Sequence, residues 1–321
     1  MKEQLVSVII PTYKRPDKLK RALESVLNQE YKTLEIIVVD DNGKNTLEQI
    51  ATTNIVISLK DNRLRKIDHS SNKGGCAARN TGIKNASGSF IGFLDDDDEW
   101  QPSFISKVMH KFEKSSSNVG AIYTSLILKN HRYKLLQKVD VGLYNENVHD
   151  KIKSGWCPIS TSLFVIKKEC FEYAGLFDEK LKSFQDFDMW LRISKKFNFD
   201  YVDEELVVKN QFEGEQVSVN PDTRSRGLET LVDKWRKEYT EEEIQYLINK
   251  FSISIYENYI LKYLIEKDKK TARSFFKNYL QISDNKRRKL VLCGTIIFGK
   301  WFYDLIMKIN IKLKGNKISN F

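Results

Sequence analysis

The chain has 321 residues, of which 41% are hydrophobic and 30% charged, the composition of an ordinary soluble protein that buries one large core and carries an appendage. Its four cysteines show no Cys-x-x-Cys spacing, which argues against a disulfide framework or a zinc knuckle and favours a reducing, cytoplasmic compartment. The net charge of +10 lies at the C-terminal end, where residues 262–321 hold fifteen Lys/Arg and four acids.

The N-terminal region carries the pattern of a parallel α/β fold. Two β-branched runs, Val6–Pro11 and Leu34–Asp41, are typical of buried strands, and apolar residues between them recur at helical spacing. Strand, helix and strand form a βαβ unit with parallel pairing. Further strands are predicted over 64–70 and 89–96, around a helix over 74–86. We therefore expect an α/β sandwich with a mainly parallel sheet up to about residue 130.

The composition of the chain changes within its second half. Strand-like runs and a helix over 184–197 come first, and after Gln216 the sequence becomes Lys/Glu-rich with helical periodicity. The segment EGEQVSVNPD supplies turn residues between these regions. We predict one domain over residues 1–215 and a helical region over 216–321.

Polar loops follow three of the predicted strands. They are PTYKR after the first strand, DDNG after the second and LDDDD after the fourth. Because ligands bind beyond the carboxyl ends of parallel strands, these loops together predict one ligand cleft.

The run FLDDDDEW is the most specific of these loops. Adjacent carboxylates raise one another's pKa unless a cation neutralises them, and a hard divalent ion takes oxygen ligands. Alternate residues at a strand end point to opposite sides, so the four aspartates cannot all serve one ion. We expect Asp98 and Glu99 to be acids at the start of the next helix, with Asp96 pointing away from the site.

The segment SSNKGGCAARNTG predicts a Gly-Gly turn and a small-residue helix that carries Arg79. An arginine in this setting suits a phosphate or a base edge. Neither G-x-G-x-x-G nor the phosphate-loop pattern G-x-x-x-x-G-K-[ST] occurs. A nucleotide diphosphate held through a metal is therefore favoured over NAD or a phosphate-loop nucleotide.

Five motifs together resemble the family 2 inverting glycosyltransferases with the GT-A fold. They are VSVIIPTYKRPDKLKRALESVLNQ, EIIVVDDNG, SNKGGCAARNTGI, FIGFLDDDDEW and FDEKLKSFQDFDMWLR, in the family's order over about residues 5–210. The resemblance implies a GT-A nucleotide-sugar-binding sandwich with a mainly parallel central sheet. It also implies a nucleotide diphosphate sugar, usually UDP-linked, as donor, with Mn²⁺ or Mg²⁺.

The resemblance assigns the nucleotide side of the site. Pro11, Tyr13 and Arg15 match the first nucleotide loop. Asp41 is similar to the carboxylate that accepts from the uracil ring, and Arg79 to the arginine near the nucleotide.

The resemblance also assigns the metal and the base. Asp95 and Asp97 align with the Asp-x-Asp pair, with Asp97 on the metal, Asp95 on the ribose or metal, and Asp96 at the variable donor-side position between them. Asp186 matches the catalytic base, which deprotonates the acceptor hydroxyl in inverting transfer. Asp188 is expected to be a helix-surface or orienting acid.

Two segments depart from the family pattern. The basic segment after the last catalytic strand offers only Lys209, which leaves its diphosphate contacts open. In the loop GWCPISTS, Trp156 fits either a sugar-stacking ring or a buried loop anchor, and Cys157 fits a small buried residue.

The tail over residues 286–317 has two accounts. Its longest uncharged run, Leu290–Gly299, has ten residues and is too short to cross a bilayer. Aromatic and aliphatic residues flanked by lysines are typical of a segment on an anionic membrane surface, which would place the chain at the inner face of the cell membrane. A helix packed on the catalytic domain with a solvated basic end explains the same pattern.

The leading hypothesis is a metal-dependent inverting glycosyltransferase that moves a hexose-type sugar to a glycan or lipid-linked saccharide in surface polysaccharide biosynthesis. A GT-A-like nucleotidyltransferase would instead release pyrophosphate and leave Asp186 without a role. A non-catalytic nucleotide-sugar-binding module would tolerate the loss of Asp186. Nucleic-acid binding is disfavoured, since the basic residues form no recognisable module.

Overall fold

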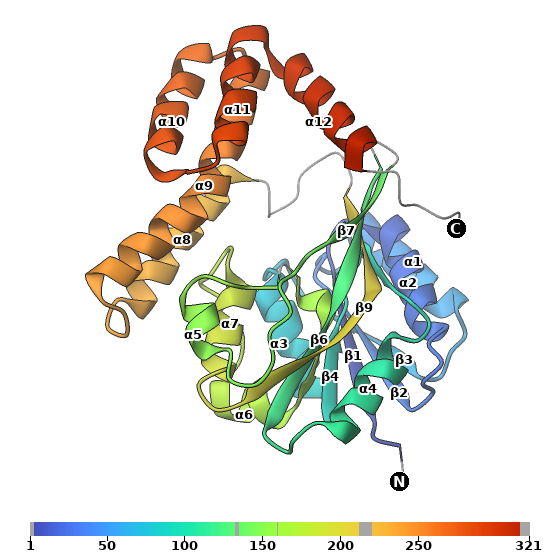
Figure 1. The fold of residues 1–321 in the computed structure, drawn as a ribbon. Coiled ribbons are helices and arrows are strands. Elements are labelled where there is room, and N and C mark those ends of the chain that lie inside the picture. Colours follow the sequence, from blue (N-terminus) through green and yellow to red (C-terminus); the bar gives the residue numbers. More distant parts are fainter. Residues whose placement is uncertain (1–2, 132–134, 159, 212–219, 315–321) are drawn as a thin grey trace. The chain divides into compact units, whose positions relative to one another are not determined.

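The computed structural model describes residues 3–131, 135–158, 160–211 and 220–314, which belong to two compact units (Figure 1). The N-terminal unit comprises Met1–Asn130, Gln137–Glu179 and Gln185–Gln211. The C-terminal unit comprises His131–Leu136, Lys180–Phe184 and Phe212–Phe321. The division into domains at residue 215 stays a prediction.

A mixed sheet forms the centre of the N-terminal unit. Its strands, in spatial order, are β3 (Leu64–Asp68), β2 (Leu34–Asp40), β1 (Val6–Thr12), β4 (Phe90–Phe93), β8 (Phe164–Lys167), β6 (Val119–Asn130), β9 (Asn198–Gln211) and β5 (Asp98–Trp100), and β7 (Leu135–Val139) pairs with β6. Pairing is parallel from β3 to β4 and between β6 and β9, and antiparallel where β8 and β5 join. The predicted α/β fold with a parallel core is confirmed.

Helices lie on both sides of this sheet (Figure 1). They are α1 (Pro16–Leu27), α2 (Leu47–Ser58), α3 (Gly75–Asn85), α4 (Phe104–Lys114), α5 (His149–Lys153), α6 (Glu169–Ala174) and α7 (Gln185–Ile193), with a short 3-10 turn, η1, over Thr161–Leu163. The helix predicted between the first two strands is confirmed as α1, and its buried face consists of Leu19, Ala22, Leu23 and Val26. This burial of one apolar stripe against the sheet stabilises the unit through the hydrophobic effect.

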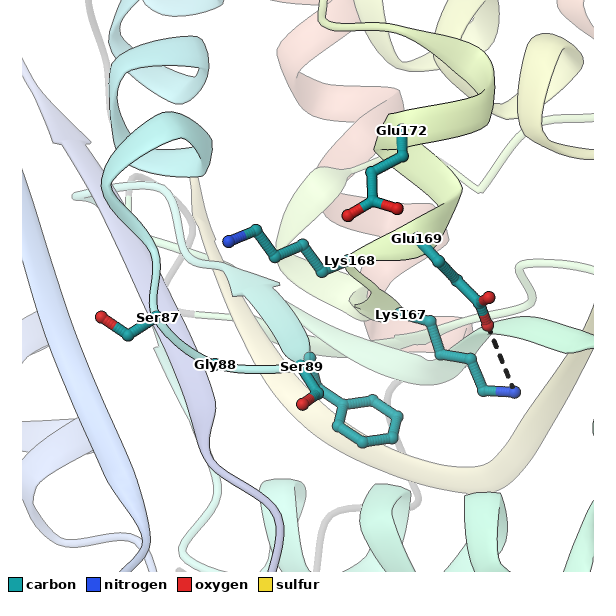
Figure 2. A pocket seen from close by; sticks show the side chains of 8 residues that line it. Ser87, Gly88, Ser89, Lys167, Lys168, Glu169 and Glu172 are labelled. Carbon is teal, nitrogen blue, oxygen red and sulfur yellow. Dashed lines mark ion pairs between the residues drawn. The ribbon is translucent and has the colours of Figure 1, made fainter.

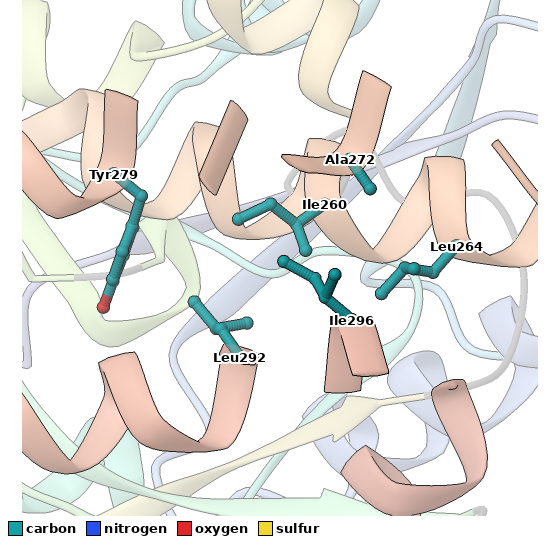
Figure 3. Packing of buried hydrophobic residues seen from close by; sticks show 6 residues of the cluster. All are labelled: Ile260, Leu264, Ala272, Tyr279, Leu292 and Ile296. Atoms are coloured by element: carbon teal, nitrogen blue, oxygen red, sulfur yellow. The ribbon is translucent and has the colours of Figure 1, made fainter. Parts of the chain in front are cut away.

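Over its described residues 220–314 the C-terminal unit is helical. Its helices are α8 (Pro221–Trp235), α9 (Glu241–Ile265), α10 (Lys269–Ile282), α11 (Lys286–Phe298) and α12 (Lys300–Lys314). Thr240 and Glu243 form a reciprocal capping box at the start of α9. Figure 3 shows the core of the unit, where side chains from α9, α10 and α11 meet: Ile260, Leu264, Ala272, Tyr279, Leu292 and Ile296.

None of the helices that the structure describes is both long enough and apolar enough to cross a membrane.

The contact between α3 and β1 leaves no room for a side chain at Gly82. A Cβ atom built there would lie 2.4 Å from Cγ2 of Ile9, which is fully buried. Since α3 carries Arg79 and β1 leads to Arg15, this close packing fixes the separation of two predicted site arginines.

We predict that Gly82→Ala destabilises the N-terminal unit. The added methyl group must displace Ile9 or α3, and overpacking of this kind costs about 1–3 kcal/mol. Urea unfolding measures the loss. Asn54→Ala, at an exposed position of α2, is the control and should change the free energy of unfolding by less than about 0.5 kcal/mol. Equal stability of the two variants would contradict the packing described.

Candidate functional site

The ends of three neighbouring strands bring the predicted loops to one edge of the sheet. In the register of the sheet Thr12 of β1 lies beside Asp40 of β2, and Ile9 of β1 lies beside Phe93 of β4. The hydroxyl of Thr12 donates a hydrogen bond of 2.8 Å to Asp96, in the loop after β4. The loops after β1 and β4 therefore lie in contact, and the ligand cleft itself stays a prediction.

Asp95, Asp96, Asp97 and Asp98, here called the acid turn, do not continue strand β4. The amide of Asp98 donates to the carbonyl of Asp95 over 3.0 Å, which closes a turn. Nη1 of Arg15 lies 2.8 Å from Asp97 Oδ2 and 3.4 Å from Asp96 Oδ1. The expectation that Asp96 points away is therefore wrong, because strand alternation does not apply within a turn.

Asp98 belongs to strand β5, where it pairs with Lys209 of β9, and α4 begins only at Phe104. The expectation that Asp98 and Glu99 are acids at a helix start is wrong. The carboxylate of Asp98 is fully buried, accepts from the Ser162 hydroxyl over 2.7 Å and lies 3.6 Å from Nζ of Lys209. Among the described residues, its Oδ1 has no hydrogen-bond partner.

Burial controls the charge of two acids in the turn. It raises the pKa of Asp96 to about 7, against the lowering effect of Arg15. It likewise raises the pKa of Asp98 to about 6, against the lowering effect of Lys209. Burial is also the largest effect on Asp95, but Arg79, Lys209 and Arg15 together outweigh it, so the pKa of Asp95 is lowered.

Arg79 links the acid turn to the start of α7. Its Nη2 lies 2.6 Å from Asp95 Oδ1, and its Nη1 donates to Gln185 Oε1 over 3.4 Å. The side chain is 11% exposed, and its buried Nε finds no hydrogen-bond partner in the part of the chain that the structure describes. A guanidinium held between a carboxylate and an amide in this way is fixed in orientation.

Asp186 lies half-buried in the first turn of α7, next to Gln185. Its Oδ1 accepts a hydrogen bond from the amide of Phe187. Burial lowers the pKa of Arg79 and of Lys209, but nearby acids, Asp186 among them, raise both above their usual values. Asp186 therefore shares one electrostatic environment with the acid turn.

Asp188, two residues further on, has a different environment. It is fully buried, and its Oδ2 forms a 2.8 Å ion pair with Arg192. Arg192 also donates to the carbonyls of Ala174 and Leu176. The expectation that Asp188 lies on the helix surface is therefore wrong. The alternative, an orienting acid, agrees with its buried pair with Arg192.

Asp41 anchors the glycine turn that precedes α3. Its carboxylate accepts from the amides of Lys73 and Gly74, both over 2.8 Å, and lies 2.7 Å from Nδ1 of His69. Gly74 has φ +90°, a conformation that favours glycine. No motif in the sequence assigns a role to His69. Its position directly after β3, at the carboxyl end of a parallel strand, is the feature that could have indicated one.

The first loop carries the remaining predicted residues. Pro11 is in β1 and Tyr13 follows it with 40% of its surface exposed. Between Tyr13 and Arg15, Lys14 has φ +56° and its amide donates to Asn42 Oδ1 over 2.6 Å. The loop after β1 is therefore tied to the loop after β2.

Trp156 anchors its loop. The indole Nε1 donates to the carbonyl of Val141 over 2.9 Å, and the ring packs edge-on against Tyr144 with centroids 5.1 Å apart. These contacts favour the loop-anchor interpretation of Trp156. Burial raises the pKa of the neighbouring Cys157 thiol, and the charge of Asp186 raises it further.

The acid turn fits a divalent cation only in part. Within the described ranges, no group of three or more His, Cys, Asp or Glu side chains is placed to hold a metal ion. However, Asp95 Oδ2 and Asp97 Oδ1 form no hydrogen bond with a described residue, because the arginines donate to the other oxygen of each carboxylate. Mg²⁺ and similar ions take one or two carboxylates and complete their shell with phosphate and water. The two oxygens fit that kind of donor set.

A separate cavity lies near Phe90, the first residue of β4, whereas the acid turn follows the other end of that strand (Figure 2). It has a volume of about 340 Å³ and is lined by Ser87, Gly88, Ser89, Phe90, Lys167, Lys168, Glu169 and Glu172. It contains none of the predicted site residues, so we do not assign the chemistry to it.

Residues 7–172 match the family model described as glycosyl transferase family 2. An uncharacterized glycosyltransferase of Rickettsia conorii is 31% identical over 274 residues, which are 85% of this chain and 44% of that protein. The chain thus spans less than half the length of this relative. WfaP of Escherichia coli, described as a UDP-Glc:α-D-GlcNAc-diphosphoundecaprenol β-1,3-glucosyltransferase, is 39% identical over 110 residues, 34% of this chain and 42% of that one.

Two solved structures share the fold. TarS 1–349 of S. aureus in complex with UDP-GlcNAc has a TM-score of 0.55 at 18% identity and covers 86% of this chain and 91% of its own. A mannosyltransferase of Pyrobaculum calidifontis in complex with GDP-Man and Mn²⁺ has a TM-score of 0.56 at 16% identity and covers 97% of this chain and 85% of its own. The GT-A-type fold expected from the sequence is confirmed.

We predict that Asp41→Ala lowers the free energy of unfolding by about 2–4 kcal/mol, because two backbone amides and His69 lose the buried carboxylate that accepts from them. The matched control is Asp68→Ala, which removes a carboxylate that is 33% exposed and paired with Lys66. A change below about 1 kcal/mol is expected there. Chemical denaturation of both variants measures the difference, and equal losses would rule out the anchoring role of Asp41.

Proposed function

We propose that this chain, which belongs to glycosyl transferase family 2, transfers a sugar from a nucleotide diphosphate sugar to a hydroxyl of a glycan or lipid-linked saccharide, with inversion at the anomeric carbon. The observation that carries this proposal is the chain of contacts from Arg15 through the acid turn and Arg79 to Gln185, which is next to Asp186. It joins a region suited to a diphosphate to a half-buried carboxylate suited to an acceptor hydroxyl.

The donor side rests on two arginines and an exposed ring. Arg15 and Arg79 hold their guanidinium groups at the acid turn, and Tyr13 is exposed beside Arg15. Guanidinium groups bind phosphate oxygens through paired hydrogen bonds, and aromatic rings pack against nucleotide bases. We propose a UDP-linked donor, a choice supported by the UDP sugars in the descriptions of WfaP and the TarS complex. Asp41 would accept from the uracil ring.

Asp97, with Asp95, would hold Mn²⁺ or Mg²⁺ through the oxygen of each carboxylate that accepts no hydrogen bond from the arginines. Such an ion offsets the negative charge that grows on the leaving diphosphate. Arg15 would then share Asp97 with the ion, and Asp96 would stay bound to Thr12 on the donor side.

Asp186 would act as the general base. Its carboxylate takes the proton of the acceptor hydroxyl while the oxygen bonds to the anomeric carbon, and the bond from that carbon to the diphosphate oxygen breaks. Arg79 and Lys209 interact electrostatically with Asp186, and their positive charges favour the ionised carboxylate that takes the proton. No enzyme nucleophile takes part in a single inverting displacement.

We also propose a role in surface polysaccharide biosynthesis, carried out in the cytoplasm. The proposal of a cytoplasmic location is supported by four cysteines that are all free thiols. The acceptor class is supported by the lipid-linked saccharide in the description of WfaP.

The test is a screen of UDP and GDP sugars for Mn²⁺-dependent hydrolysis and for thermal stabilisation of the chain. Stabilisation by one UDP sugar together with release of UDP supports the proposal. Release of pyrophosphate from a sugar phosphate and a nucleoside triphosphate would instead identify a nucleotidyltransferase. Donor binding without turnover, in the presence of candidate acceptors, would identify a binding module.

We predict that Asp186→Asn lowers transfer or donor hydrolysis by about 10²–10⁴-fold, because the amide cannot take the proton, while the affinity for the donor stays within about twofold. Calorimetry and product release measure the two effects separately. Asp203→Asn, at an exposed position of β9, is the matched control and should change neither. Transfer at the control's rate by Asp186→Asn would remove the base assignment.

We predict that Asp97→Asn abolishes the part of donor affinity that depends on the metal. Removal of the ion with EDTA should weaken donor binding to the unmodified chain, whereas the variant should bind weakly with or without EDTA. Titration calorimetry with and without Mn²⁺ measures this. A variant that keeps the full response to Mn²⁺ would exclude Asp97 as a ligand.

A further inference from the structure

Large apolar side chains are exposed where α11 meets α12 in the C-terminal unit. Ile297 and Phe298, at the end of α11, expose 56% of their surface each, and Trp301, at the start of α12, exposes 61%. Leu305 and Ile309 continue the stripe along α12 with 43% and 42%. We call these five residues the junction surface.

The junction surface is not an unfilled part of the core. On the inner side, a Cβ added to Gly294 would lie 2.3 Å from the ring of Phe302, so α11 and α12 are in close contact there. Leu292 and Ile296 of α11 are buried in the cluster shown in Figure 3. The inner sides of α11 and α12 are thus packed against apolar side chains, and the exposed stripe is a second apolar surface that takes no part in this packing.

The stripe has helical spacing. Trp301, Leu305 and Ile309 are separated by four residues each, which places them along one face of α12. A helix whose exposed face carries an aromatic ring and branched aliphatic side chains is typical of insertion into the boundary between lipid head groups and acyl chains. Gly299, with φ +93°, ends α11 and allows the second helix to start in a new direction.

The charge of these helices specifies the kind of partner. Residues 286–314 contain eight Lys/Arg and one acid, Asp304. Lys286 is exposed at the start of α11, and Lys300 is half-buried beside Trp301. Basic residues around an apolar stripe complement a surface that is anionic outside and apolar beneath, which describes a membrane with anionic lipids. A nucleic acid would match the charge but would leave Leu305 and Ile309 without an apolar partner.

We propose that the junction surface docks the chain on an anionic lipid membrane, with Trp301, Leu305 and Ile309 entering the interface and the lysines contacting lipid phosphates. Of the two accounts that the sequence left open for the tail, the exposed stripe favours the membrane. The binding does not require the transfer reaction. It deepens the proposed function, however, because a docked enzyme meets a lipid-linked acceptor at the membrane surface.

The test is flotation of the full chain with vesicles of phosphatidylcholine alone and of phosphatidylcholine with phosphatidylglycerol. We predict binding to the anionic vesicles at about 0.05 M salt, and its loss at about 0.5 M salt or without phosphatidylglycerol. Trp301→Ala should lower the partition coefficient onto the anionic vesicles on the order of tenfold, because less apolar surface is buried in the membrane. Lys286→Gln/Lys300→Gln should lower it roughly twenty-fivefold, at about fivefold per lysine.

Two matched controls separate docking from general stickiness. Tyr246→Ala removes another exposed ring of the same unit, and Lys114→Gln removes an exposed lysine of the N-terminal unit. Both should bind vesicles like the unmodified chain. The proposal fails if the chain does not float with anionic vesicles or if the controls lose as much binding as the junction variants. It also fails if Trp301→Ala disrupts self-association and leaves vesicle binding unchanged. Donor hydrolysis, measured in the same samples without lipid, reports the proposed transfer activity separately.

Discussion

The site depends on the balance between four consecutive carboxylates and three cations that come from distant parts of the chain. Arg15 follows β1, Arg79 is in α3 and Lys209 is in β9, and each lies beside at least one acid of the turn. Removing one partner of a buried ion pair leaves an uncompensated charge, which is strongly destabilising. The positions of β1, α3 and β9 are therefore energetically tied to the acid turn.

Burial and cation contacts together give the four acids different properties. Burial raises the pKa of Asp96 and Asp98, so folding favours their protonated forms and reduces repulsion within the turn. Asp95 remains ionised beside Arg79. Asp95, Asp97 and Asp98 each keep an oxygen without a described hydrogen-bond partner, but Asp98 is fully buried. The pair expected from the Asp-x-Asp spacing thus differs physically from its neighbours, although the reason is the shape of a turn rather than strand alternation.

Local pattern was sufficient for β1, β2 and α1, since each needs only its own apolar spacing to define its buried face. It was insufficient for Asp98, whose strand β5 exists only because it pairs with β9, more than a hundred residues later in the chain. The role of Asp41 depends in the same way on amides from the loop before α3. Long-range partners of this kind leave no periodic signal in the sequence, and the family resemblance supplied roles rather than contacts.

The helix α7 illustrates how a short motif separates support from chemistry. Asp186 and Asp188 are two residues apart, roughly 200° around the helix, so they cannot serve the same side. Asp188 forms a buried pair with Arg192, which in turn binds the carbonyls of Ala174 and Leu176 and fixes the helix. Gln185 holds Arg79 at the same helix start. The position of Asp186 therefore follows from contacts made by its neighbours. The pair of Asp188 with Arg192 and the contact of Gln185 with Arg79 thus hold the helix start that carries the proposed base.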